Sequence, residues 1–217
     1  MLKKILLGIV SVSLLIAAAG VYRFNFTNDD IYVVDAESSL DTENNVMLTL
    51  FSINTDDYWQ IQLPNSKAKA SLTELREYDD LHLATGKYQN GEERGSVGLD
   101  YYKITPLNLG NIDDEMIFSV PFFVSNQGTG VFWYLGLFKL NTETGEIKQI
   151  DTFFLGDRIK VDELKTEEPF DATSSLHITF LKHSQQQSMA ETLSEKVEQY
   201  IKVSIEGFQN GPLSLKE

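Results

Sequence analysis

The residues best suited to recognition are an adjacent acid and base, Asp157 and Arg158, inside the run Phe153–Val161. The planar guanidinium of Arg158 offers a rigid fork of donors that suits a carboxylate or the backbone carbonyls of a partner. The pair is therefore a candidate recognition element. A structural interpretation competes with it: Asp157 closes a hairpin through its side chain while Arg158 pairs across the sheet. We favour the structural role and keep the pair as a candidate.

An acidic segment, Asn111–Glu115, is the only stretch that suggests a metal ion. Calcium loops place oxygen ligands at alternate positions around a glycine turn. Asn108, Asn111, Asp113 and Glu115 fit that pattern in part, and the order D-x-D-x-D-G is absent. We expect a solvated turn here, with calcium binding as the alternative.

Catalytic signatures are lacking. The chain has no cysteine, which excludes thiol nucleophiles, cysteine zinc clusters, disulfides and a lipid anchor on cysteine. His177 and His183 are too far apart along a strand to share a metal, about 20 Å, and His82 has no partner nearby in sequence. No G-x-S-x-G, H-E-x-x-H or phosphate-binding motif occurs. The sequence predicts no catalytic, cofactor-binding or metal-binding residue and favours a protein that is not an enzyme.

Aromatic residues suggest a ligand site instead. Phe132, Trp133 and Tyr134 follow one another, and Phe123 lies on the preceding apolar run. We expect these aromatics to be mainly core, and we keep Trp133, Tyr134 and Phe123 as candidate lining of a pocket for a small apolar or carbohydrate ligand.

The elements that must position these residues are mostly strands. The pattern predicts a mainly β fold: a single antiparallel sheet or sandwich-like domain with one or two short helices. Ser71–Glu74 matches a capping box and predicts a helix to about Asp80, and a helical turn is expected within 190–196. Strands are expected at 46–54, 58–63, 85–88, 96–104, 116–125, 131–140, 146–155, 158–164, 176–180 and 201–205.

The segment 116–164 has the clearest pattern. Its first two runs, 116–125 and 131–140, are almost uninterrupted apolar sequence, which is typical of strands covered on both faces. Gly156-Asp157 is expected to form a two-residue hairpin turn, so that four strands make an antiparallel meander. Pro121 cannot donate to a ladder and predicts a bulge or an edge-facing position.

The N-terminus is expected to direct export. Ile5–Tyr22 carries no charge and would span about 27 Å as a helix, close to the thickness of a bilayer core. Two interpretations remain open for residues 1–24: a retained signal anchor, or a signal peptide cleaved after Ala19. Lys3 and Lys4 place the N-terminus in the cytoplasm under either one. Residues 25–30 form a linker and 31–217 an exported domain.

Composition and charge narrow the classes of partner. The 217 residues include 42% hydrophobic and 11% aromatic side chains, enough for one domain with a real core, and the formal net charge is −14. So acidic a surface repels phosphate backbones and anionic headgroups, which excludes nucleic acid as a partner.

Several short segments carry a resemblance to known sequences. The run FFLGDRIKV at 153–161 resembles a segment of uncharacterised exported bacterial proteins, in which a strand ends in Leu-Gly-Asp-Arg and restarts with a branched aliphatic residue. Asn126, Gly128 and Gly130 before an aromatic strand are similar to their upstream loop. Ser188 departs from their Pro-Met-Ala. The resemblance covers about residues 115–205 and implies export and a β fold, with no known activity.

Together these features predict an envelope protein held in the bacterial inner membrane and facing the periplasm, or a soluble periplasmic or secreted protein if the segment is cleaved. The expected function is a non-enzymatic protein-interaction module with an envelope protein as partner. The alternatives are a small-molecule or carbohydrate binding module and, third, a hydrolase whose catalytic groups meet only in the fold.

Overall fold

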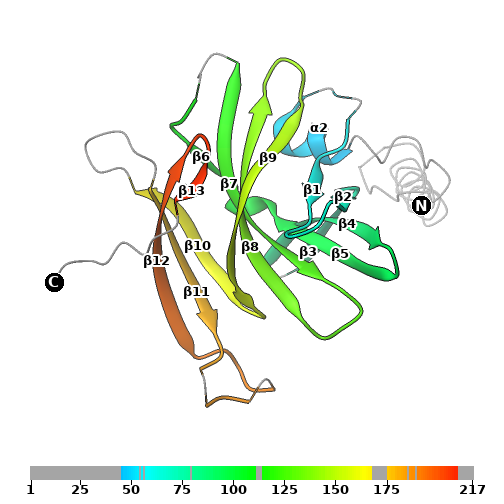
Figure 1. Ribbon diagram of the computed structural model, residues 1–217. Coiled ribbons are helices and arrows are strands. Elements are labelled where there is room, and N and C mark those ends of the chain that lie inside the picture. Colours follow the sequence, from blue (N-terminus) through cyan, green and yellow to red (C-terminus); the bar gives the residue numbers. More distant parts are fainter. Residues whose placement is uncertain are drawn as a thin grey trace, which may run out of the picture. The chain divides into compact units, whose positions relative to one another are not determined.

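A computed structural model describes residues 45–53, 55, 57–78, 80–110, 114–167, 175–184, 186–188 and 190–209. These residues form a mainly antiparallel β structure (Figure 1). The predicted signal or anchor segment 1–24, the linker 25–30 and residues 31–44 lie outside them. Within the described part, no helix has the length and apolar character needed to cross a membrane.

The centre of the fold is a seven-stranded antiparallel sheet in the order β3-β4-β5-β7-β8-β9, with β6 also paired to β7. Its strands are β3 (Glu74–Tyr78), β4 (Leu81–Asn90), β5 (Glu93–Asp100), β6 (Thr105–Leu107), β7 (Glu115–Ser125), β8 (Val131–Asn141) and β9 (Ile147–Asp157). A short 3-10 helix, η1 (Tyr101–Lys103), connects β5 to β6.

The two apolar runs form β7 and β8, and both faces of these strands are covered, as predicted. Side chains alternate between two cores: Phe138 packs into the first core and Leu137 into the second. Pro121 pairs with Leu135 on the β8 side. On the other side, β6 pairs with residues 117–119 and β5 with 122–125, so the proline falls in the break between them. Its missing N–H is accommodated there.

One face of the central sheet is covered by the helix α2 (Asn45–Phe51) and the hairpin of β1 (Gln60–Gln62) and β2 (Lys69–Ser71). Trp59 is fully buried there and meets Phe118 and Phe138 edge to face, at centroid distances of 5.6 and 5.3 Å. We call this cluster, which also includes Ile61, the first core.

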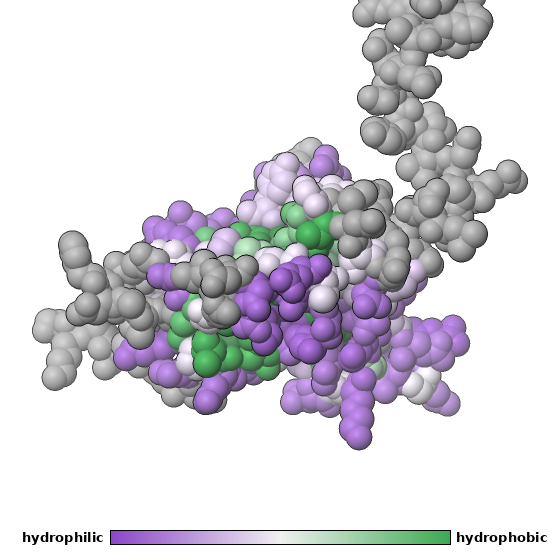
Figure 2. Space-filling model, turned by 90° about the horizontal axis from the view of Figure 1, so that it is seen from above, coloured by the Kyte–Doolittle hydropathy of each residue, from purple (hydrophilic) through white to green (hydrophobic). Residues whose placement is uncertain are grey.

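The opposite face is covered by a four-stranded sheet in the order β10-β11-β12-β13. Its strands are β10 (Lys160–Glu167), β11 (Ser175–Lys182), β12 (Glu195–Ser204) and β13 (Gly207–Gln209). Leu176 and Ile178 from β11 pack with Trp133 and Leu135 from β8. This cluster is the second core. On the face of the molecule drawn in Figure 2, hydrophilic residues surround smaller hydrophobic areas, as the acidic composition leads one to expect.

The predicted fourth strand of the meander does not pair with the third. β9 ends at Asp157, and β10 begins at Lys160 in the other sheet, paired with β11. The prediction of a hairpin at Gly156-Asp157 is therefore wrong. Arg158 takes a left-handed conformation with φ of 49°, and its N–H donates to the carbonyl of Val131 at 2.7 Å. This corner turns the chain out of one sheet and into the next.

Three further predictions of local structure are wrong. Residues 71–78 hold the last residue of β2 and all of β3, because the N–H groups of Leu72 and Thr73 bond to Trp59 and Thr85 on neighbouring segments, each at 2.9 Å, and not to a capping residue. Where a strand was expected at 46–54, residues 46–51 belong to helix α2. The region expected to hold a helical turn near 190–196 has turns and the start of β12.

Candidate functional site

The Asp157–Arg158 pair is engaged within the fold. Oδ2 of Asp157 accepts two hydrogen bonds from Arg158, from Nε at 3.0 Å and from a terminal nitrogen at 2.8 Å. Oδ1 accepts the backbone N–H of Val131 at 2.9 Å. The two side chains remain 28% and 33% exposed. Their principal contacts hold the corner between the sheets, and the outer part of Arg158 stays accessible.

The three aromatic candidates do not share one face. Trp133 lies in the second core and contacts the ring of Phe123 at 5.3 Å, whereas Tyr134 points to the opposite side of the sheet and stacks on Phe122 at 5.5 Å. Adjacent residues of a strand necessarily face opposite ways. The sheet therefore does not bring Trp133, Tyr134 and Phe123 together to line one pocket.

Phe123 reaches into a hollow of about 610 Å³ over β3, β4 and β5. Its ring lies above Gly98, where an added Cβ would come within 2.4 Å of the ring. This close approach explains the glycine in the middle of β5. The other lining residues are mostly polar and charged, including Arg76, Lys87 and Glu74.

On the other face of β8, a row of aromatic rings emerges from the first core. Tyr134 pairs with Phe154 of β9, and their rings lie 5.3 Å apart. Phe154 is 55% exposed and Phe132, two residues before Tyr134, is 36% exposed. We call Phe132, Tyr134 and Phe154 the aromatic patch. Burial raises the pKa of Tyr134. Its hydroxyl, protonated at neutral pH like that of any tyrosine, can donate a hydrogen bond at the rim of the patch.

Arg158 and Asp157 border this patch, because Asp157 pairs with Phe132 in the register of β8 and β9. A hollow of about 150 Å³ adjoins it on the side of the β1–β2 hairpin, lined in part by Leu63 and Pro64. The surface thus combines exposed rings with an arginine at the edge, a composition typical of protein interfaces.

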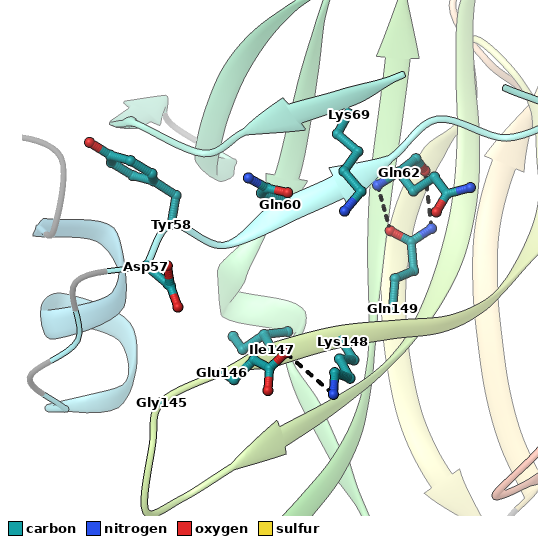
Figure 3. A pocket seen from close by; sticks show the side chains of 10 residues that line it. All are labelled: Asp57, Tyr58, Gln60, Gln62, Lys69, Gly145, Glu146, Ile147, Lys148 and Gln149. Carbon is teal, nitrogen blue, oxygen red and sulfur yellow. Dashed lines mark hydrogen bonds and ion pairs between the residues drawn. The ribbon is translucent and has the colours of Figure 1, made fainter. Parts of the chain in front are cut away.

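A second feature lies further along β9. A groove of about 430 Å³ lies between β1 and the start of β9, and Figure 3 shows the side chains that line it. The two strands are joined where Gln149 reaches Gln62: the backbone N–H of Gln62 donates to Oε1 of Gln149 at 2.9 Å, and Nε2 of Gln149 donates to the carbonyl of Gln62 at 3.1 Å. From this bridge the strands splay apart toward Asp57 and Gly145 (Figure 3). We call this the β1–β9 groove.

The polar segments weighed from the sequence contribute less. Asn111–Asp113 lies outside the described residues, and Glu115 accepts a hydrogen bond from Lys139 at 2.8 Å. His177 is 8% exposed and stacks on Tyr200 at 4.5 Å. In the part of the chain that the structure describes, no three histidine, aspartate or glutamate side chains come together as a possible metal site.

Sequence reasoning missed Phe154 and Gln149 as site residues. Phe132 shares its strand parity with Tyr134, so that part of the patch was readable from β8 alone. Phe154 joins the patch only through the register of β8 and β9, which shifts between Trp133 and Tyr134. A bulge of this kind has no reliable sequence signal, and neither does a side chain that bonds a strand 87 residues away.

In comparisons with known proteins, no family model, curated protein or solved structure matches the chain.

Proposed function

We propose that this protein is an exported, membrane-held module whose β domain binds an envelope protein through the aromatic patch. The observation that carries the proposal is the exposure of Phe154 and Phe132 side by side with Tyr134. Among the described residues of the central sheet, Tyr78 on β3 is also exposed, but it lies apart from this cluster. Burying apolar surface contributes about 25 cal/mol per Å². A partner that covers the two exposed phenylalanines would therefore gain from burying their apolar surface.

The size of the adjoining hollow supports a protein partner over a small ligand. Pockets that enclose small molecules usually hold about 300–1,000 Å³, whereas the hollow beside Phe132 and Tyr134 holds about 150 Å³. A carbohydrate or small apolar ligand would leave most of its surface in water there. Export and anchoring rest on the uncharged segment Ile5–Tyr22 and the two lysines before it.

The proposal is tested by crosslinking in the cell, followed by purification of the full chain from detergent-solubilised membranes. We expect one near-stoichiometric protein partner with the wild type, and its loss with Phe154→Ser. The matched control is Ile205→Ser, which removes an isoleucine that is 58% exposed in the turn between β12 and β13. This control should retain the partner.

Replacing residues 1–24 with a cleavable signal separates the contribution of the anchor from that of the domain. Equal capture of the same partner by wild type and Phe154→Ser would contradict a role for the patch. Absence of any partner, under conditions that recover a known envelope complex, would contradict the proposed function.

A further inference from the structure

We infer that the β1–β9 groove binds an extended peptide segment by strand addition, with the edge of β1 as the template. This inference rests on the proposed function in one respect, that the natural partner is a protein, and it names the mode in which part of that partner would bind. The groove is separate from the aromatic patch, so the two can be tested independently.

The first support is a mimic already present in the fold. The side-chain amide of Gln149 offers one acceptor and one donor to the backbone N–H and carbonyl of Gln62. A residue of a neighbouring antiparallel strand would offer the same pair of groups from its own main chain. The outer edge of β1 therefore presents backbone groups that a peptide strand can bond. The side chain of Gln149 occupies this edge at Gln62 only.

The second support is the direction of the backbone at the open end. Two residues that flank β1 bond on the β2 side. The N–H of Leu63 donates to the carbonyl of Ala68, and the carbonyl of Trp59 accepts the N–H of Leu72. Ladder bonding alternates along an antiparallel strand. Gln60, like Gln62, thus directs its N–H and carbonyl away from β2 and toward the groove, and no described residue bonds to them.

β9, which faces β1 across the groove, also has backbone groups that point away from its own sheet. The N–H of Asn141 donates to the carbonyl of Glu146 at 2.9 Å, so the next pair, Leu140 and Ile147, does not exchange ladder bonds. Ile147 therefore points its backbone groups away from β8, at the free edge of β9. Gln60 and Ile147 both line the groove, which gives it main-chain donors and acceptors on two walls.

The side chains of the groove carry both signs of charge. Glu146 and Lys148 form an exposed ion pair at 3.3 Å. Asp57 and Lys69 also line the groove, and neither side chain has an ion-pair partner among the described residues. A groove of balanced charge does not select a polyanion. Main-chain groups repeating every second residue, about 7 Å apart along a strand, match a peptide better than a sugar.

The test uses the full chain in detergent, with a phage-displayed library of random ten-residue peptides as the probe. Peptides enriched on the protein are synthesised, and their affinity is measured by fluorescence anisotropy. Each peptide amide is then N-methylated in turn. Strand addition predicts a loss of at least tenfold in affinity at alternate amides and little change at the amides between them. Loss at consecutive amides, or at none, would overturn the proposal.

Variants of the protein locate the site. Gln149→Ala removes the mimic and frees the edge at Gln62, so peptide affinity should rise several-fold, a result that mere damage to the fold would not give. Gln60→Pro removes one backbone donor and should abolish binding; if it fails to fold, the N-methyl series and Gln149→Ala still decide. Unchanged affinity in Gln149→Ala would overturn the assignment to this groove.

Two other outcomes would reassign the groove. Failure to enrich any peptide, with binding of envelope oligosaccharides that is lost in Lys69→Ala, would assign it to a sugar. A dimer in sedimentation experiments that Gln60→Pro dissociates would assign the edge to a second copy of the chain. Phe154→Ser should leave peptide binding unchanged, so failure of the groove and failure of the aromatic patch give different results.

Discussion

At the scale of single residues, the conformation of Arg158 is the most informative. A left-handed conformation costs a residue with a side chain about 1–2 kcal/mol, and the fold retains arginine there with φ of 49°. The two hydrogen bonds that the Arg158 guanidinium donates to Asp157, and the one that Val131 N–H donates to Asp157, offset this cost.

The first prediction separates the two contributions at this corner. Arg158→Ala loses the ion pair and keeps the backbone cost, whereas Arg158→Gly loses the ion pair and relieves that cost. We expect the glycine variant to be more stable than the alanine variant by about 1 kcal/mol, measured by urea unfolding. Equal stability would contradict this prediction, because the strain that glycine relieves would then be no larger than the extra entropy it gives the unfolded chain. Both variants should weaken partner capture alike if Arg158 contacts the partner.

A second prediction concerns Tyr101 in η1. Burial, with the hydrogen bond to Glu77 at 3.2 Å and its charge, raises the pKa of Tyr101 to about 12. In the unfolded chain a tyrosine ionises near pH 10, so between these values the folded state holds a proton that the unfolded state has lost. The stabilisation that the raised pKa of Tyr101 contributes to folding is fully present below about pH 10, and it is lost as the pH rises toward 12. Tyr101→Phe should lose less stability than wild type between pH 9 and 11 in urea titrations; parallel losses would contradict this.

At the scale of elements, the bridge between β1 and β9 sets how firmly the hairpin closes over the first core. The hairpin is short, and β1 has three residues. An intramolecular hydrogen bond contributes about 0.5–1.5 kcal/mol, so the two bonds of Gln149 add to the stabilisation that the buried Trp59 and Ile61 give this hairpin.

The third prediction follows from that bridge. Gln149→Ala should increase the hydrogen-exchange rate of the Gln62 amide by about tenfold, because one bond of about 1.4 kcal/mol corresponds to that factor. Lys148→Ala is the control: this neighbouring side chain is 65% exposed and pairs with Glu146, and its removal keeps both bonds of Gln149, so the rate should stay unchanged. If the Gln62 amide stays protected in Gln149→Ala, the hairpin is held by the core alone.

Elements with long apolar runs were predictable from the sequence, and short ones were not. β7 and β8 were placed to within a residue because eleven-residue apolar strands leave few alternatives. Helix α2 was mistaken for a strand although Val46, Met47, Leu50 and Phe51 recur at helical spacing, because β-branched and aromatic residues favoured the strand prediction. Ser71–Glu74 imitated a capping box, yet its backbone donors find partners on other strands. Whether this segment caps a helix or pairs as a strand depends on those distant partners, which the local sequence does not reveal.

The candidate site divides in the same way. Tyr134 was identified because it lies on a long strand, and Asp157 and Arg158 because their types are distinctive. Their grouping with Phe154 depends on the register across a bulge, and β10 leaves for a second sheet at the corner where Arg158 is left-handed, held there by its pairing with β11. Both are tertiary properties, and they decide which side chains share a surface.

At the scale of the whole molecule, the two cores are joined by the strands that they share. Because β7 and β8 send alternate residues to both sides, neither core can open without disturbing the central sheet. The chain has two tryptophans, Trp59 in the first core and Trp133 in the second, so each core carries its own fluorescent reporter.

The fourth prediction uses these reporters. Variants that retain only Trp59 or only Trp133 should give coincident urea transitions, as expected for one cooperative unit. Ile178→Ala, a truncation in the second core that costs about 2–5 kcal/mol, should lower the transition reported by Trp59 in the first core as well. Two separate midpoints, or a Trp59 signal that ignores Ile178→Ala, would show that the cores unfold independently.

The hairpin that closes the first core also sets an order of events during synthesis. Gln62 lies 87 residues before Gln149, and Trp59 is covered in part by Phe118 and Phe138 of β7 and β8, which are made long after it. A chain made from its N-terminus therefore leaves Trp59 without this cover until β7 and β8 have followed. Contacts so distant in sequence form slowly. The first strands that the structure describes are therefore among the last to be protected, and their apolar side chains stay open to unwanted contacts until the central sheet is complete.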